Sequence, residues 1–375
     1  MVAVLVGYTS SVAIVFQAAH AAGASPAEIG SWLWALGIGM GVTCIGLSWW
    51  TKAPILTAWS TPGAALLATS LQGLTMHEAV GVFVVTSALI AITGWLGVFD
   101  RLMKHVPATL AAAMLAGVLL KFGIQAFVGL QAEGGLVLAM LVTYVLTRKF
   151  LVRYAVPLTL LVGLVVAWST DQVPWQSIVW QWATPIWTPP SFNINALLGV
   201  ALPLYIVTMA SQNVPGLAVL RSNGYSTPAS PLIGWTGLTG MVLGPFGGFQ
   251  YNLAAITAAI CMSPDADANP AKRYQAAMWA GLFYALLGML GATVASLFAA
   301  LPLALVMAIA GLALLPTIAN SLHQALQEPT QRDAAMVTFL VTASGVTLAG
   351  VASAFWGLVL GLITLHVWKP KKPVR

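Results

Sequence analysis

Two segments of the chain join helix-breaking residues to the start of a good helix, and each could help to bind an anion. In the first, Pro62 restrains Thr61 toward an extended backbone. Ser60 or Thr61 is then a natural N-cap, with Pro62 at the first helical position. In the second, the glycine-rich stretch 244–252 is a poor helix, and 253–261 is a good one. A helix N-terminus carries unpaired N–H groups and a partial positive charge, so the pair is suited to an anion.

The predicted site also needs polar side chains that can donate to the anion and apolar ones that can hold the rest of it. The broken segments and two other apolar segments supply hydroxyl, amide and aromatic groups. We therefore predict a substrate site formed by Tyr8, Ser11, Gln17, Trp59, Ser60, Thr61, Gly63, Met209, Gln212, Asn213, Gln250, Tyr251, Asn252 and Leu253. The alternative is that the amides bond neighbouring helices and that the aromatic rings serve only packing.

Acidic side chains are missing from every predicted membrane-spanning core. All nine lie in loops or at span ends, namely Glu28, Glu78, Asp100, Glu133, Asp171, Asp265, Asp267, Glu328 and Asp333. A cation carrier would normally bury a carboxylate, because ionisable groups inside spans mark ion paths. The pattern favours a monoanion whose remainder is apolar. Lys121 either snorkels to an interface or lines a water path. His20 and His323, at span ends, either titrate near neutral pH or pack at the interface.

The composition defines the elements that must position these residues. The chain has 375 residues, of which 59% are hydrophobic and 6% charged, and its mean hydropathy is +0.90. Too few charges are present to cover a soluble globule, so a soluble enzyme and a nucleic-acid binder are both excluded. Cys44 and Cys261 are far apart in sequence, which excludes a disulfide framework and a zinc cluster, and we expect no cofactor. The continuous apolar runs predict an all-α polytopic membrane protein.

Charges, prolines and glycines divide the chain into fourteen predicted spans. These are 2–22, 28–50, 54–71, 78–99, 107–128, 133–147, 154–169, 194–214, 229–244, 246–262, 274–299, 302–320 and two short spans within 334–367. The first has no basic region before it, so we interpret it as a span and not a signal peptide. Of the 15 basic residues, 14 fall in loops or a tail predicted to be cytoplasmic, which places both termini inside and the connector 171–190 outside. A bundle of 12 or 13 helices is the alternative.

Weak internal similarities suggest that the two halves of the chain repeat. Pro107 and Pro302 begin similar segments 195 residues apart, and 62–66 resembles 252–256 at an offset of 190. Seven spans per half would make the repeat inverted, which is the architecture of many secondary transporters. The two broken spans, 3 and 10, would then meet near the membrane midplane with short extended segments. Chance similarity among helices rich in Ala, Gly and Leu is the alternative.

Segments 54–66, 207–216 and 253–261 resemble the benzoate:proton symporter (BenE) family of bacteria, which is similar in fold to uracil permease-type transporters. The resemblance covers essentially the whole chain. It implies a 7+7 inverted repeat with a core domain of 1–99 and 194–300 and a gate domain of 100–193 and 301–375. It also implies a multi-pass protein of the bacterial cytoplasmic membrane, an elevator-like motion and a homodimer.

One departure from the uracil permeases bears on the substrate. Gln250-Tyr251-Asn252 stands where those permeases have Gly-Glu-Asn, so Tyr251 replaces an acid. A carboxylate at this place would repel an anion, so its loss favours a carboxylate substrate over a nucleobase. The loss of the acid also leaves open which group carries the proton.

Two functions fit these features. The first is proton-coupled uptake of benzoate or a similar aromatic carboxylate, and the alternative is an exchanger or channel for an inorganic anion such as sulfate. An aromatic pocket would favour the first and a hydroxyl-rich pocket the second. A membrane enzyme would need a cluster of acids, His or Cys within the spans, and the sequence has none.

Overall fold

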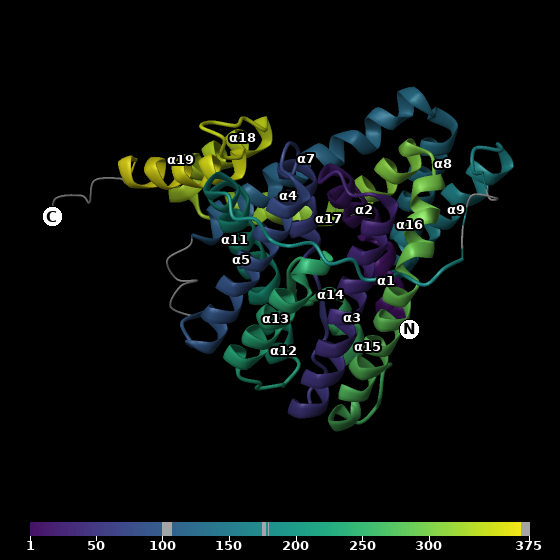
Figure 1. Ribbon diagram of the computed structural model, residues 1–375, viewed down its shortest axis with the longest axis horizontal. Helices are drawn as coiled ribbons and strands as arrows, with labels where there is room; N and C mark the ends of the chain where they lie inside the picture. Colours follow the sequence, from purple (N-terminus) through teal and green to yellow (C-terminus); the bar gives the residue numbers. More distant parts are fainter. Residues whose placement is uncertain (100–106, 175–177, 179, 369–375) are drawn as a thin grey trace.

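The computed structural model describes residues 1–99, 107–174, 178 and 180–368 and is mostly helical (Figure 1). Predictions that concern Asp100, Arg101, Lys104 and the basic tail 369–375 lie outside the described residues. The helices of the first half are α1 (Val2–Thr9), α2 (Val12–Ala21), α3 (Pro26–Thr51), α4 (Thr61–Ser70), α5 (Met76–Trp95), α7 (Ala108–Ala132), α8 (Gly134–Phe150) and α9 (Ala155–Ser169).

The second half begins with a long irregular helix. It consists of α10 (Ile194–Ala196), the π-helical turn η3 (Leu197–Ala201), α11 (Leu202–Thr208), a second π-helical turn η4 (Met209–Asn213) and α12 (Val214–Ser222). The remaining helices are α13 (Ala229–Leu243), α14 (Ile256–Met262), α15 (Tyr274–Met289), α16 (Gly291–Ala300), α17 (Leu303–Leu326), α18 (Arg332–Ser344) and α19 (Ser353–Val367).

By length and composition, six helices in the described part of the chain can cross a membrane. They are Val2–Ala21, Pro26–Thr51, Met76–Trp95, Ala108–Ala132, Ile194–Ser222 and Leu303–Leu326. A seventh is the pair α15 and α16, which is bent by 63°. The sequence predicts one span at 274–299, and the bend falls inside it. Each remaining predicted span also coincides with a helix, but these helices are shorter, and two of them, α4 and α14, follow a strand.

The two strands form a small antiparallel sheet between segments almost 200 residues apart. In β1 (Thr57–Trp59) and β2 (Tyr251–Leu253), Ala58 lies opposite Asn252. The Ser60 N–H donates to the Gln250 carbonyl at 3.0 Å, which extends the pairing by one residue. Strand pairing satisfies backbone groups that no helix satisfies, which is the requirement for extended backbone at membrane depth.

The prediction that a helix covers 253–261 is wrong at its start. Leu253 belongs to β2, and α14 begins at Ile256 and has seven residues. The alignment of 62–66 with 252–256 is therefore also wrong, because Pro62 is helical and Asn252 is in a strand. The N-caps of the two half-helices, Ser60 and Ala255, lie 195 residues apart, which is the offset between Pro107 and Pro302, the N-caps of α7 and α17.

Small residues let the longest helices approach closely. A Cβ atom added at Gly37 of α3 would lie 2.4 Å from the Cα atom of Gly288 in α15. A Cβ atom added at Gly94 of α5 would lie 2.2 Å from the backbone nitrogen of Gly234 in α13. Helices in lipid associate through such close contacts, since burial of apolar surface offers little gain there. The pairs α3–α15 and α5–α13 therefore form a closely packed frame, and α3 and α13 contact the sheet.

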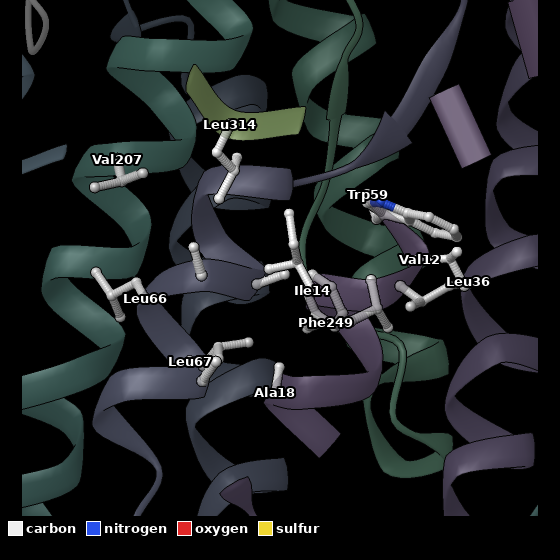
Figure 2. Packing of buried hydrophobic residues seen from close by; sticks show 14 of the residues in the cluster. Val12, Ile14, Ala18, Leu36, Trp59, Leu66, Leu67, Val207, Phe249 and Leu314 are labelled. Carbon is white, nitrogen blue, oxygen red and sulfur yellow. The ribbon is translucent and has the colours of Figure 1, made fainter. Parts of the chain in front are cut away.

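The buried core surrounds α4 and the end of β1 (Figure 2). Ile14 and Ala18 of α2, Leu66 and Leu67 of α4, and Trp59 are each at most 3% exposed. Residues of α3, α11 and α17 belong to the same cluster. The half-helix α4 is thus held by helices from both halves of the chain.

Candidate functional site

The first part of the site is the start of α4. Ser60 is fully buried, and its Oγ accepts from the Gly63 N–H and from the Thr208 hydroxyl, both at 3.1 Å. This confirms Ser60 as the N-cap of the two residues proposed. Thr61 is the first helical residue and is half-buried, so Pro62 stands second in the helix and not first.

The second part is the π-helical turn η4, which is joined to β2. The Asn213 Oδ1 accepts from the Leu253 N–H at 2.9 Å, and its Nδ2 donates to the Met209 sulfur at 3.2 Å. The Asn252 Nδ2 donates to the Leu253 carbonyl at 3.1 Å and to the Gln212 Oε1 at 3.5 Å. The amide of Asn213 therefore holds the junction together. Single π-turns occur frequently at functional sites.

The third part is a pair of buried amides. Gln250 and Asn252 are fully buried, and the Gln250 Nε2 donates to the Phe83 carbonyl at 3.3 Å. The Gln250 Oε1 and the Asn252 Oδ1 have no hydrogen-bond partner among the described residues. Buried acceptors without partners are costly, and a ligand that donates hydrogen bonds would satisfy them.

Tyr251 points away from these amides because neighbouring residues of a strand face opposite sides. It is fully buried, and its hydroxyl donates to the Ala35 carbonyl of α3 at 2.7 Å. Its ring lies where a Cβ atom on Gly39 would clash. In this conformation, its hydroxyl is engaged within the protein.

The aromatic and hydroxyl residues of the first two helices form a neighbouring cluster. The rings of Tyr8 and Trp59 lie 5.2 Å apart, and the Trp59 Nε1 donates to the Ser11 Oγ at 2.8 Å. The Tyr8 hydroxyl is buried and has no partner among the described residues. The structure thus brings Tyr8 and Ser11 to the side of β1 that carries Trp59.

Gln17 lies apart from both groups, in the wall of a cavity of about 540 Å³. The cavity is lined by Phe16, Phe122 and Phe298, by Ala68 and Thr69 at the end of α4, and by His20 and Lys121. Its wall contains no residue of 60–63 or 250–253. Lys121 also lines a second cavity of about 270 Å³. His323 is exposed in the last turn of α17.

The phenylalanines of this cavity were not among the residues predicted from the sequence. They come from α2, α7 and α16, and no spacing within any one helix distinguishes them from packing residues. The signal that pointed here was Lys121, the one basic residue inside a predicted span. Lys121 borders two cavities. This observation favours the interpretation in which its side chain lines a water path over the one in which it snorkels to an interface.

Known proteins resemble the chain over nearly its whole length. The model of the family described as benzoate membrane transport protein (BenE) matches residues 1–367. The inner membrane protein YdcO of Escherichia coli is 51% identical over 359 residues, which is 96% of this chain and 92% of that protein. The benzoate membrane transport protein of Acinetobacter baylyi is 39% identical over 370 residues, covering 98% and 94%.

Solved structures share the fold. The transmembrane domain of the cyanobacterial bicarbonate transporter BicA has a TM-score of 0.57 at 12% identity and covers 96% of this chain and 97% of its own. Murine Slc26a9, an anion transporter in the inward-facing state, has a TM-score of 0.58 at 14% identity and covers 98% and 67%. The chain spans 64% of a further SLC26A9 structure, with a TM-score of 0.57.

These matches confirm the resemblance found in the sequence and the mostly helical membrane-transporter fold. Proteins of this family are named as transporters and not as enzymes. The chain belongs to the benzoate membrane transport protein (BenE) family of multi-pass bacterial membrane proteins.

Proposed function

We propose that this transporter couples the uptake of benzoate or a similar aromatic carboxylate to protons. The observation that carries the proposal is the junction of the two broken spans. There, the N-terminus of α4, the β1–β2 sheet and the π-turn η4 meet, and three buried polar atoms, in Tyr8, Gln250 and Asn252, have no partner among the described residues. The substrate would bind between Ser60–Gly63 and Gln250–Leu253.

The contacts between helices support a fourteen-span inverted repeat. In the order of the fourteen predicted spans, α3 and α15 fall in spans 2 and 11, and α5 and α13 fall in spans 4 and 9. The members of each pair are in contact. A shift of seven spans exchanges these two pairs. The same shift exchanges α8–α9 with α18–α19, and it returns the pairs α7–α17 and β1–β2 to themselves. A two-fold axis between the halves would produce this pattern.

The same contacts support a division into core and gate domains. The core would comprise 1–99 and 194–300, joined by the frame of α3–α15 and α5–α13. The gate would comprise 100–193 and 301–375, joined by α7–α17 and α7–α18. Transport would move the core relative to the gate in an elevator-like manner, within a homodimer whose termini are cytoplasmic.

The cavity beside α4 favours an aromatic substrate over an inorganic anion. Phe16, Phe122 and Phe298 line it together with aliphatic side chains. Aromatic rings pack favourably on one another, whereas an ion such as sulfate would lose hydration against the phenylalanines without gaining hydrogen bonds from them. The fold itself does not distinguish the two functions.

The unpartnered acceptors at the junction support a proton that travels with the substrate. The Gln250 Oε1 and the Asn252 Oδ1 would accept from a donor, and a protonated carboxyl group supplies one. An ionised carboxylate has only acceptors. Binding of the protonated acid at this place, after capture of the anion elsewhere, would couple the two fluxes without a buried acidic side chain.

The test is uptake of radiolabelled benzoate by proteoliposomes. An inwardly directed proton gradient should drive accumulation, and collapse of the gradient with a protonophore should abolish it. Unlabelled benzoate should compete, and sulfate should not. Sulfate uptake without benzoate uptake would instead establish the inorganic-anion function.

A further inference from the structure

Lys121 occupies an unusual place for a basic residue in a membrane helix. It lies near the middle of α7, 13 residues or about three and a half turns after the helix begins at Ala108. Its side chain borders both cavities, which also share Thr69 and Gln72. The ammonium group therefore stands between two hollow spaces, and charged groups in spans generally face such spaces.

The walls of these cavities leave the positive charge without an acidic neighbour. Among the described residues that line either cavity there is no Asp or Glu. His20 is the other titratable residue in the larger cavity. Gln17, whose Nε2 is buried and has no partner among the described residues, belongs to the same wall. The electrostatic character of the larger cavity thus favours an anion.

The same cavity offers an aromatic surface. Three phenylalanine side chains line it, and about 540 Å³ is ample for one benzene ring with a carboxylate. A compound with both groups would be matched at each end: the ring by the phenylalanines and the carboxylate by an ammonium and amide N–H groups.

We propose that this cavity is a capture site for an aromatic carboxylate, in which Lys121 binds the carboxylate before the substrate reaches the junction. The proposal rests on the proposed function and adds a second site to it. The helix α4 connects the two places, with Thr69 near its end and Ser60 at its start. Nine residues at 1.5 Å per residue separate them by about 14 Å.

The position of the cavity between the proposed domains gives the site a place in the transport cycle. Gln17 and Thr69 belong to the core segments, and Lys121 and Phe122 belong to the gate segments. In the predicted topology, α4 and α7 both end on the outer side. The site would therefore collect substrate from outside, and movement of the core would separate its two walls.

A structural role for Lys121 would have a different signature. Thr69 lies in the last turn of α4, where a cation stabilises the helix dipole, and such a role needs only a positive charge or a hydrogen-bond donor. Loss of that role would lower the amount of folded protein and the maximal rate. Loss of substrate capture would raise KM and leave the maximal rate almost unchanged.

The experiment compares Lys121→Gln, Lys121→Arg and Lys149→Gln in proteoliposomes. Lys149, in the last turn of α8, is the control because its replacement changes the net charge equally and it lines neither cavity. We expect Lys121→Gln to raise the KM for benzoate by about tenfold or more, the effect of one hydrogen bond to a charged group. Lys121→Arg should stay within about threefold of the wild type. Added salt should raise the KM of the wild type and have less effect on Lys121→Gln.

Two results would overturn the capture site while leaving the proposed function intact. One is an unchanged KM in Lys121→Gln when the wild type transports benzoate. The other is an equal fall in the maximal rate for Lys121→Gln and Lys121→Arg at constant KM. A wild type that does not transport any aromatic carboxylate would instead refute the proposed function itself.

Discussion

Replacement of Ser60 by alanine tests whether the N-cap of α4 holds the junction together. The change removes an oxygen that accepts from both the Gly63 N–H and the Thr208 hydroxyl, inside a fully buried site. Loss of a serine N-cap costs about 1 kcal/mol. The Thr208 hydroxyl, which is also fully buried, would lose its partner at a further cost of roughly 1–3 kcal/mol.

We therefore expect Ser60→Ala to lower the free energy of unfolding by about 2–4 kcal/mol. The second substitution Thr208→Val removes the unpaired hydroxyl, so the double variant should be less destabilised than the sum of the two single variants by about 1–2 kcal/mol. The measurement is the free energy of unfolding of the purified protein in mixed micelles as SDS is added. Ser70→Ala, at the other end of α4, is the control and should change the stability by less than about 0.5 kcal/mol.

The outcome that contradicts this reasoning is additivity. If the costs of Ser60→Ala and Thr208→Val simply add, the two hydroxyls do not share a hydrogen bond. If Ser60→Ala is as mild as Ser70→Ala, the start of α4 does not depend on its cap.

Three further predictions concern the site, the proton and the topology. Thr61→Asp should abolish benzoate uptake, since its carboxylate would compete with the substrate's carboxyl group for the N–H groups at the start of α4, whereas Thr61→Ser should be mild because Ser60 supplies the cap. An acid in the first turn favours a helix, so the variant should fold, and wild-type uptake by it would refute the site. A protein with His20→Gln and His323→Gln should still accumulate benzoate with unchanged dependence on external pH; loss of accumulation while exchange of labelled for unlabelled benzoate continues would assign the proton to a histidine. Gln176→Cys, outside the described residues, should react with an impermeant maleimide on intact cells, and labelling only after permeabilisation would refute the fourteen-span topology.

Local sequence signals were sufficient for most helices and for one cap. Proline at position 62 and serine at position 60 act on their own neighbours, so a helix start after an extended segment could be predicted there. The chain as a whole is apolar enough that each helix in the described residues lies close to a predicted span. The family was likewise identified from short segments, because those segments are distinctive by themselves.

The second broken span was harder because its structure depends on a distant partner. Residues 253–255 have good helix formers, yet Leu253 pairs with Thr57 in the sheet, and its N–H donates to Asn213. Those two contacts replace the bonds that a helix would have supplied. No residue near Leu253 in the sequence indicates that it pairs with a strand almost 200 residues away.

Composition, periodicity and short motifs are properties of neighbouring residues, so they were enough to predict a helical membrane protein, the place of its apolar segments and its family. Which polar groups meet and where the cavities lie depends on how distant segments pack together. Tyr251 and Asn252 are adjacent in sequence, but the pleat of β2 sends one into the core and the other toward the π-turn. Three phenylalanines and Lys121 line one cavity because α2, α7 and α16 converge there, and convergence is set by long-range packing that no local pattern encodes.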